Sequence, residues 1–290
     1  MPDPFHSIRR LIQKPADAVR WASVLEVTAP KVGNVYPGRP FKDLTFFDFV
    51  VAADIAAKHF NSESKRMSKR IYKAVEETNG LTQTNVNLGI LLLLGPLVAA
   101  DELMTRLERK QRNAKDWLSA INIVLESLDG QDGQNIFRAI QIAGAGGLGE
   151  VDSMDIAAVY GEVDVLEAMR LSMDRDRVAK QYATEFVDLF EEVLPIVWHS
   201  INQSGDLLNG IAMAHLQLLR DQTDSLIARK NGIEAAFAVR LRAAEVDAED
   251  AASIQNFDDY LRDPSHRLNP GTTADLIAAS LYILLRTPNL

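Results

Sequence analysis

Hydrophobic residues recur along most of the chain every three or four positions, the spacing that places them on one face of an α-helix. Alternating runs of Val, Ile and Thr, which are typical of half-buried strands, are nearly missing. The pattern therefore predicts an all-α protein. The expected helices span residues 16–29, 45–60, 64–78, 87–109, 114–128, 134–143, 153–158, 162–170, 175–201, 205–228, 232–246, 249–262 and 272–286.

Glycine and proline separate these segments. Breaks are expected at Pro30, Gly80, Gly130 with Gly133, Gly144–Gly149 and Pro264–Gly271. No internal repeat and no long Gly/Ser or Pro linker divides the chain, and apolar helices flank the glycine-rich stretch, which is typical of a compact loop. We therefore expect one multi-helix globular domain over residues 1–290, with its active site at helix ends.

The composition and net charge exclude several classes of binding partner. The 290 residues carry a net charge of −9, which argues against nucleic acid as the main partner. There is no cysteine, so disulfides, thiolate zinc sites and a cysteine nucleophile are excluded, which fits a reducing compartment. No signal-peptide core follows Arg9 and Arg10, and the apolar run 88–100 is shorter than the roughly 20 residues that span a bilayer. We expect a cytoplasmic protein without a membrane partner.

The most informative segment lies near the C-terminus. Asn269-Pro270-Gly271-Thr272-Thr273-Ala274-Asp275 runs directly into an apolar helix. One capping side chain would serve the start of that helix, yet several polar groups gather there, where the helix dipole is positive. Such a place suits an anion like phosphate.

Three other polar breaks resemble it. Pro30 should turn the chain after a helix that carries Glu26, presenting Lys31, Gly33 and Asn34 in a loop that a phosphate can approach closely. Asn85 and Asn87, beside two threonines, exceed what capping of the following apolar helix requires. The third break runs from Asp224 through Arg229 and Lys230 to Gly232. Four such breaks in one helical protein predict a single shared polar site.

Other candidates have simpler explanations. Asp221 and Asp224 at a three-residue spacing fit either a salt-bridged solvated helix face or a divalent-cation site, and the spacing alone favours the solvated face. Asp258 and Asp259 resemble one aspartate-rich metal motif, but they stand alone in an acidic stretch, so a solvated face is expected there too. The five histidines show no HxH or HExxH spacing.

Taken together, these residues resemble the triphosphoribosyl-dephospho-CoA synthase family. The resemblance is carried by Leu25-Glu26-Val27 with Pro30-Lys31-Val32-Gly33-Asn34-Val35, then Asn85-Val86-Asn87-Leu88-Gly89, Asp224 through Gly232, and Asn269 through Asp275. The motifs occur in the family's order from residue 25 to 285. Each is weak alone, and the ordered set is fairly specific.

The chain also departs from the family pattern. Members that serve citrate lyase or malonate decarboxylase usually carry an aspartate after the Pro-Lys-x-Gly loop and a Gly-Ala-His-x-Asp-Met segment. Here Tyr36 takes the first place and Phe41-Lys42-Asp43-Leu44 the second, so that only Asp43 remains. The chain is therefore similar to a shorter, divergent branch of the family. For such a branch the resemblance implies the fold and the use of ATP more strongly than it implies the identity of the acceptor.

The resemblance implies an ATP-using transferase. The 2′-hydroxyl of dephospho-CoA attacks the anomeric carbon of the ATP ribose, adenine leaves, and the product is a prosthetic-group precursor. An oxocarbenium-like transition state needs carboxylates, and a triphosphate needs cations, N–H groups and Mg²⁺. The catalytic candidates are Glu26, Asp43, Asp224 and Asp275, with Asp224 and Asp275 as metal ligands and Glu26 or Asp43 nearer the ribose. The candidate nucleotide and phosphate ligands are Lys31, Gly33, Asn34, Asn85, Asn87, Arg229, Lys230, Asn269, Gly271, Thr272 and Thr273.

Two alternatives stay open. The same ATP site could serve a different cofactor precursor, as the loss of the histidine-containing segment suggests. The chain could instead be a helical nucleotide-binding protein without turnover, although the retention of so many carboxylates beside the polar breaks argues for catalysis. The expected partners are small molecules, ATP and dephospho-CoA or a related acceptor, and homo-oligomer formation is left open.

Overall fold

The computed structural model describes residues 3–64, 66–108, 112–144, 164–262 and 266–288. Within these ranges the chain forms 15 α-helices, one π-helical segment and no β-strand, so the prediction of an all-α fold is confirmed. Tyr36 and Arg39 form an isolated bridge inside a loop.

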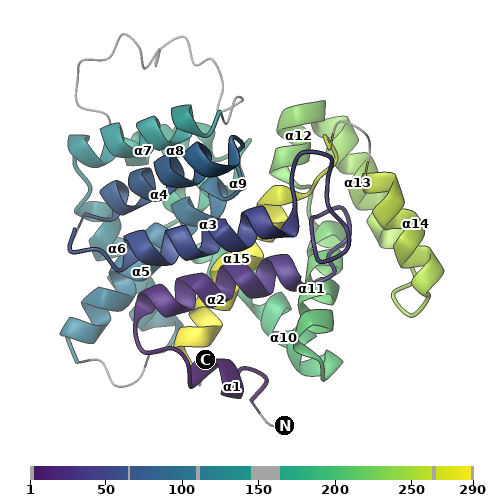
Figure 1. The fold of residues 1–290 in the computed structure, drawn as a ribbon, viewed down its shortest axis with the longest axis horizontal. Coiled ribbons are helices and arrows are strands. Elements are labelled where there is room, and N and C mark those ends of the chain that lie inside the picture. Colours follow the sequence, from purple (N-terminus) through teal and green to yellow (C-terminus); the bar gives the residue numbers. More distant parts are fainter. Residues whose placement is uncertain (1–2, 65, 109–111, 145–163, 263–265, 289–290) are drawn as a thin grey trace.

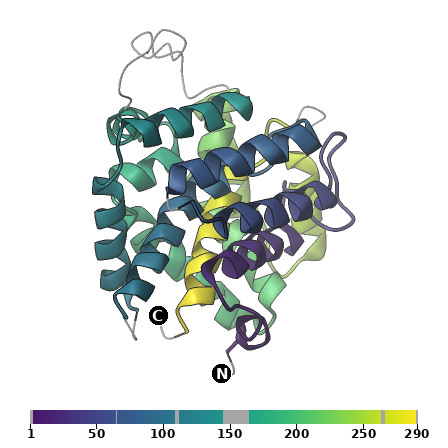
Figure 2. The same ribbon diagram turned by 60° about the vertical axis from the view of Figure 1, so that its left-hand side comes forward.

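The helix α15 (Gly271–Arg286) runs through the centre of the molecule (Figures 1 and 2). Every residue from Leu276 to Leu285 is buried. A helix that is apolar on all sides must be surrounded by protein, and here α2 (Pro15–Thr28), α5 (Leu88–Arg106) and the helices near residues 200–220 surround it. The first turn of α15, with its polar side chains, therefore opens inside the protein.

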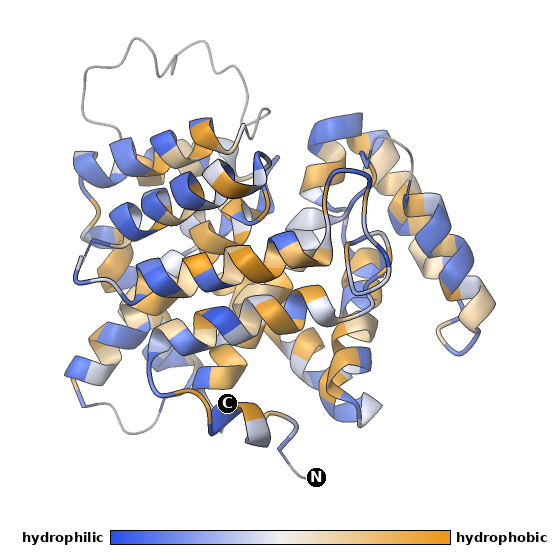
Figure 3. Ribbon diagram, in the orientation of Figure 1, coloured by the Kyte–Doolittle hydropathy of each residue, from blue (hydrophilic) through white to orange (hydrophobic). Residues whose placement is uncertain are grey.

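The larger hydrophobic core surrounds α15, and a set of helices on one side of it contributes much of this core. Along this side α2 packs on α3, α3 on α4, α4 on α7 and α5 on α6. Figure 3 shows hydrophobic residues along α3 and hydrophilic ones on the outer turns of α4 and α7. The bounds are α3 (Phe46–Phe60), α4 (Met67–Thr82), α6 (Ala114–Glu126) and α7 (Gly130–Ile142).

A second, smaller core joins the helices on the right of Figure 1. Val32 from the loop after α2 packs there with Ile227, Phe257 and Leu261. The helices that contribute are α11 (Leu207–Asp221), α12 (Ser225–Asn231), α13 (Ile233–Glu245) and α14 (Ala251–Leu261). The remaining elements are α1 (His6–Arg9), α8 (Val165–Ser172), α9 (Arg177–Ala183), the π-helix η1 (Leu189–Val193) and α10 (Leu194–Ser204).

The prediction of one continuous helix over 175–201 is wrong. The chain forms α9, a turn, η1 and α10 instead, and Glu185 and Phe186 in the turn adopt left-handed φ values of 52° and 66°. Pro195 fits the change from η1 to α10, because proline has no N–H to donate to the preceding turn and suits the first turn of a helix. Asp188 holds the turn by accepting from Arg177 (2.9 Å) and Lys180 (2.6 Å).

The prediction of one helix over 205–228 is also wrong. Helix α11 ends at Asp221, and α12 begins at Ser225 with Asp224 as its N-cap. Asp221 and Asp224 therefore do not share a helix face. Gly80, Gly130 and Gly133, expected as breakers, lie inside or at the start of helices α4 and α7.

Helix α5 is long and apolar enough, by length and composition, to cross a membrane, but 72% of its apolar 18-residue stretch is buried inside the protein. This burial identifies it as a core helix. The helix expected over 153–158, and all of the glycine-rich stretch except Gly144, lie outside the described residues. The remaining expected helices are present with ends shifted by a few residues.

Candidate active site at the helix ends

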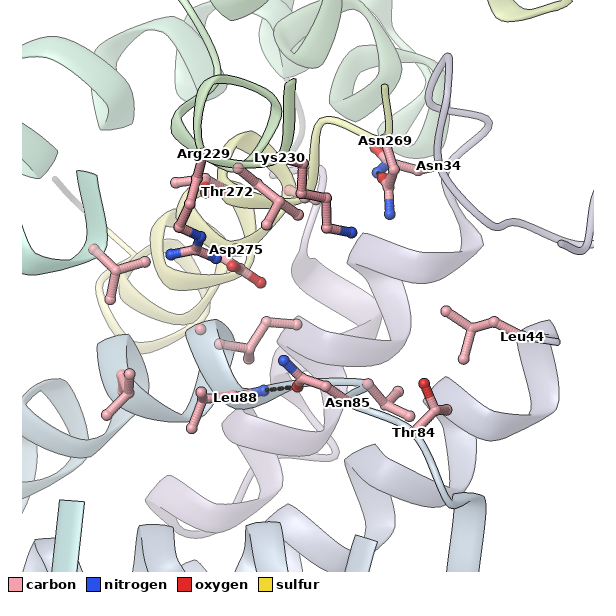
Figure 4. A pocket seen from close by; sticks show the side chains of 18 of the residues that line it. Asn34, Leu44, Thr84, Asn85, Leu88, Arg229, Lys230, Asn269, Thr272 and Asp275 are labelled. Atoms are coloured by element: carbon pink, nitrogen blue, oxygen red, sulfur yellow. Dashed lines mark hydrogen bonds between the residues drawn. The ribbon is translucent and has the colours of Figure 1, made fainter. Parts of the chain in front are cut away.

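A pocket of about 350 Å³ lies where several helices end or begin. Glu26 comes from the last turn of α2, Asn85 and Gly89 from the start of α5, and Asp275 from the first turn of α15. Figure 4 shows Arg229 and Lys230 reaching toward the same space from α12. All four polar breaks of the sequence thus contribute to one pocket. The predicted site residues that line it are Glu26, Asn34, Asp43, Asn85, Arg229, Lys230, Asn269, Gly271, Thr272 and Asp275.

Asp275 presents a carboxylate to the pocket without a bound partner. No hydrogen bond or ion pair joins it to another residue in the described part of the chain. Burial raises the pKa of Asp275 well above its ordinary value, and the charges of Glu26, Asp224 and Asp176 raise it further, against a smaller opposing effect of Arg229. The carboxylate is held in a site that favours its protonated form, or a cation beside it.

Glu26 and Lys31 form a buried ion pair at the pocket wall. Nζ of Lys31 lies 2.8 Å from Oε1 of Glu26 and also donates to the backbone carbonyl of Glu26. Lys31 is 0% exposed, and only Glu26 of the two lines the pocket. Burial, and next the charge of Lys31, hold the pKa of the neighbouring His215 well below its ordinary value. Lys31 therefore holds the Glu26 carboxylate in place from behind the wall.

Asp224 lies outside the pocket lining and joins two helices. Its Oδ1 accepts from the N–H groups of Leu226 (2.9 Å) and Ile227 (3.1 Å), and its Oδ2 accepts from the N–H (2.7 Å) and Oγ1 (2.8 Å) of Thr273. Burial raises the pKa of Asp224, while these hydrogen bonds lower it. The start of α15, predicted to hold a phosphate, is thus capped by a carboxylate of the chain itself.

Replacement of Asp224 by alanine is expected to lower the free energy of unfolding by about 2–4 kcal/mol, because it leaves several buried donors unpaired at two helix starts. Chemical denaturation would measure the loss. Asp221→Ala is the matched control: Asp221 is exposed at the end of α11, and a change within about 0.5 kcal/mol is expected there. Equal stability of the two variants would contradict the linking role of Asp224.

Cationic and amide groups face the same space. Nη1 of Arg229 donates to Oδ2 of Asp176 (2.5 Å), which holds the guanidinium beside Asp275. Nδ2 of Asn34 donates to Oδ1 of Asn269 (2.6 Å) and ties the first break to the fourth. Oδ1 of Asn34 and Nε of Arg229 are buried and have no hydrogen-bond partner in the described part of the chain. These atoms suit a polar ligand.

The two asparagines of the second polar break lie in different surroundings. Oδ1 of Asn85 accepts from the N–H of Leu88 (3.2 Å), so Asn85 caps α5 while it lines the pocket (Figure 4). Asn87 points away and donates to the carbonyl of Ala52 (3.4 Å). Thr272 lines the pocket and its Oγ1 accepts a hydrogen bond from the hydroxyl of Ser225 (3.1 Å), whereas the Thr273 hydroxyl donates to Oδ2 of Asp224.

The expectation that Asp258 lies on a solvated helix face is wrong. It is buried and accepts from the N–H of Gly33 (2.7 Å) and from the guanidinium groups of Arg39 and Arg262. Gly33 therefore lies outside the pocket lining, and its φ of 73° and close neighbours leave no room for a side chain. Asp258 anchors the loop that carries Asn34, while Asp259 stays exposed.

The pocket rim holds an aspartate and a histidine from distant parts of the chain. Asp43 is exposed, and its Oδ1 lies 3.5 Å from Nε2 of His266. The His266 ring stacks on Phe41 with ring centroids 4.1 Å apart. A histidine thus stands in space beside the segment Phe41–Leu44, which carries none in its own sequence.

Sequence reasoning missed Asp176 and His266. Asp176 accepts from the N–H of Val178 (2.8 Å) as the N-cap of α9, so an Asp before a short helix was the available signal. The continuous helix expected over 175–201 concealed it. His266 offered no signal, because its partners come together only through the fold.

The fold and the pocket define an all-α protein with a small-molecule site of mixed charge. The sequence profile of CitG, described as ATP:dephospho-CoA triphosphoribosyl transferase, matches residues 12–289. The chain therefore belongs to this family: it is a transferase that uses ATP and transfers a triphosphoribosyl group to dephospho-CoA.

A solved structure supports the fold. A chain from Archaeoglobus fulgidus, assigned as a triphosphoribosyl-dephospho-CoA synthase, superposes with a TM-score of 0.63 at 20% identity, covering 82% of this chain and 97% of that one. At this identity the likeness shows the shared fold alone. A comparison with the curated proteins gives no match.

Proposed function

We propose that the pocket at the helix ends is the active site, and that ATP and dephospho-CoA meet in it. The observation that carries the proposal is the convergence of four polar segments, far apart in the sequence, on one pocket with Glu26 and Asp275 in its wall. A helical protein without catalytic turnover would have no use for two carboxylates in this wall, since burying each of them costs stability.

Arg229, Lys230 and the amides of Asn34 and Asn269 are proposed to bind the triphosphate. Charged donors form the shortest and strongest hydrogen bonds to phosphate oxygens, and a nearby acidic partner such as Asp176 orients the guanidinium. Nε of Arg229, which has no hydrogen-bond partner among the described residues, supports this role. Gly271 and Thr272 at the start of α15, with Asn85 opposite, complete the proposed nucleotide lining.

Mg²⁺ is proposed to enter with ATP beside Asp275. Within the described residues no three His, Asp or Glu side chains gather as a protein-only metal site, but Mg²⁺ bound with nucleotides commonly takes one or two carboxylates besides phosphates and water. The open carboxylate of Asp275 fits that donor set. Both oxygens of Asp224 already accept two hydrogen bonds each, so Asp224 is proposed to position α12 and Thr273 rather than bind the metal. Bound Mg²⁺ would supply charge neutralisation of the triphosphate.

Glu26 is proposed to act at the ribose. The 2′-oxygen of dephospho-CoA forms a bond to C1′ of the ATP ribose as the bond from C1′ to the adenine nitrogen breaks. A carboxylate beside C1′ stabilises the developing positive charge and accepts the hydroxyl proton, while adenine leaves with the bonding electrons and is protonated. Glu26 suits this task because Lys31 fixes one of its oxygens from outside the pocket.

The acceptor is proposed to approach over the rim, where Asp43 and His266 lie. Both groups are proposed to contact the incoming molecule, because Asp43 is exposed and His266 lies beside it. We further propose that the chain acts as a single domain over residues 1–290, in the cytoplasm, without nucleic-acid or membrane partners.

The proposal is tested by chromatography of adenine. Purified protein is incubated with ATP and Mg²⁺, with and without dephospho-CoA, and the adenine released is quantified. Adenine that appears only with dephospho-CoA is the expected result. Binding of ATP without adenine release in the presence of dephospho-CoA would favour a different cofactor precursor as acceptor, and absence of ATP binding would overturn the assignment of the pocket.

A further inference from the structure

Gly89, in the first turn of α5, lies directly against the carboxylate of Asp275. A Cβ atom built on Gly89 would lie 2.0 Å from Oδ2, 2.7 Å from Cγ and 3.2 Å from Oδ1 of Asp275. Real contacts of a Cβ atom are almost never shorter than 3.0 Å. The carboxylate thus occupies the volume that any other residue at position 89 would fill.

Backbone conformation does not explain a glycine at this position. Gly89 has no left-handed φ, unlike Gly33 and Gly205, and it lies inside a regular helix where alanine is the more favourable residue. Glycine is required here because there is no space for a side chain beside the Asp275 carboxylate. Helices α5 and α15 pack on each other in the core, so neither backbone can retreat to make room for a side chain.

The close approach of Asp275 to Gly89 also affects the electrostatic surroundings of the carboxylate. Asp275 feels the negative charges of Glu26, Asp224 and Asp176, and it makes no hydrogen bond within the described residues that would hold it in place. Contact with Gly89 brings the carboxylate to the start of α5, where the helix dipole is positive. A larger residue would push the carboxylate out of this position and into the pocket.

We propose that Gly89 is a positioning residue for the transfer reaction: its missing side chain fixes where the Asp275 carboxylate stands. The effect on activity rests on the proposed function of Asp275, whereas the effect on the position of the carboxylate does not. Gly89→Ala tests both, since alanine adds one methyl group and changes no charge.

We expect Gly89→Ala to lower kcat for adenine release by about 10- to 100-fold, because a displacement near 1 Å can cost about this much. The matched control is Gly80→Ala. Gly80 lies in helix α4 with nothing within 4 Å of its Cβ position, so this variant should keep full activity and an equal or higher melting temperature.

A cycle of melting temperatures tests the contact without relying on catalysis. Gly89→Ala should lower the melting temperature in the parent protein, and should no longer lower it in an Asp275→Ala background, where the clash is absent. An equal loss in both backgrounds would overturn the inference. A crystal structure of Gly89→Ala with Asp275 unmoved would overturn it as well.

The two proposals can fail separately. A cycle that confirms the contact, together with unchanged kcat in Gly89→Ala, would sustain the positioning of Asp275 and count against its role in the reaction. Loss of kcat without coupling in the cycle would count against the positioning by Gly89 and leave the pocket's function standing.

Discussion

Replacement of Asp275 by asparagine is expected to reduce adenine release by about 10²- to 10³-fold, the range seen when one charged or polar group is removed from a preorganised active site. Asparagine keeps the size of the side chain and loses the charge that Mg·ATP needs beside it. Turnover measured at saturating ATP and dephospho-CoA gives the effect on kcat, and calorimetry with Mg·ATP gives the effect on affinity.

The same substitution should stabilise the metal-free protein. The folded-state pKa of Asp275 is raised, chiefly by burial and then by Glu26, so the folded state binds the proton more tightly than the unfolded chain. Stability from this group is complete below the unfolded pKa near 4 and is lost as the pH rises through the folded pKa. Asparagine removes that loss, so Asp275→Asn should melt at a higher temperature than the parent protein at pH 8.

Thermal unfolding in EDTA at pH 5 and pH 8 measures this gain, which should be larger at pH 8. Asp221→Asn is the control: Asp221 is exposed and lies outside the pocket, so neither activity nor pH dependence should change. Normal turnover of Asp275→Asn would remove Asp275 from the mechanism. A drop in stability at pH 8 would show that its charge is compensated in the folded protein.

The fold class and the shared site could be predicted because each rests on a local signal. Apolar residues at helical spacing mark the helices, and turn-forming polar residues mark the helix ends that face the pocket. The convergence of Asn34, Asn85, Arg229 and Asp275 required only that these ends meet. Ordered motifs shared with a known family supplied the expectation that they do.

The roles inside the site could not be assigned from sequence. Asp224 and Asp275 both lie next to polar breaks, and only the packing shows that Asp224 is consumed by four hydrogen bonds while Asp275 accepts none from the described residues. Lys31 is a residue type that commonly binds phosphate, but here its side chain is buried and pairs with Glu26. Such differences depend on contacts between segments far apart in the chain.

Glu26→Gln is expected to lower kcat by about 10²- to 10⁴-fold, the contribution of a positioned acid–base group. It should also destabilise the protein, because Lys31 would remain buried without its partner, and loss of one member of a buried ion pair costs about 3–5 kcal/mol. The activity of this variant alone therefore cannot separate catalysis from folding.

The double variant Glu26→Gln/Lys31→Met makes that separation. Removing both members of a buried ion pair is often nearly neutral, so the melting temperature should return toward that of the parent protein. Adenine release should stay as low as in Glu26→Gln, because the carboxylate at the ribose is still absent. Recovery of activity together with stability would show that the pair is structural and that another carboxylate in the pocket accepts the proton.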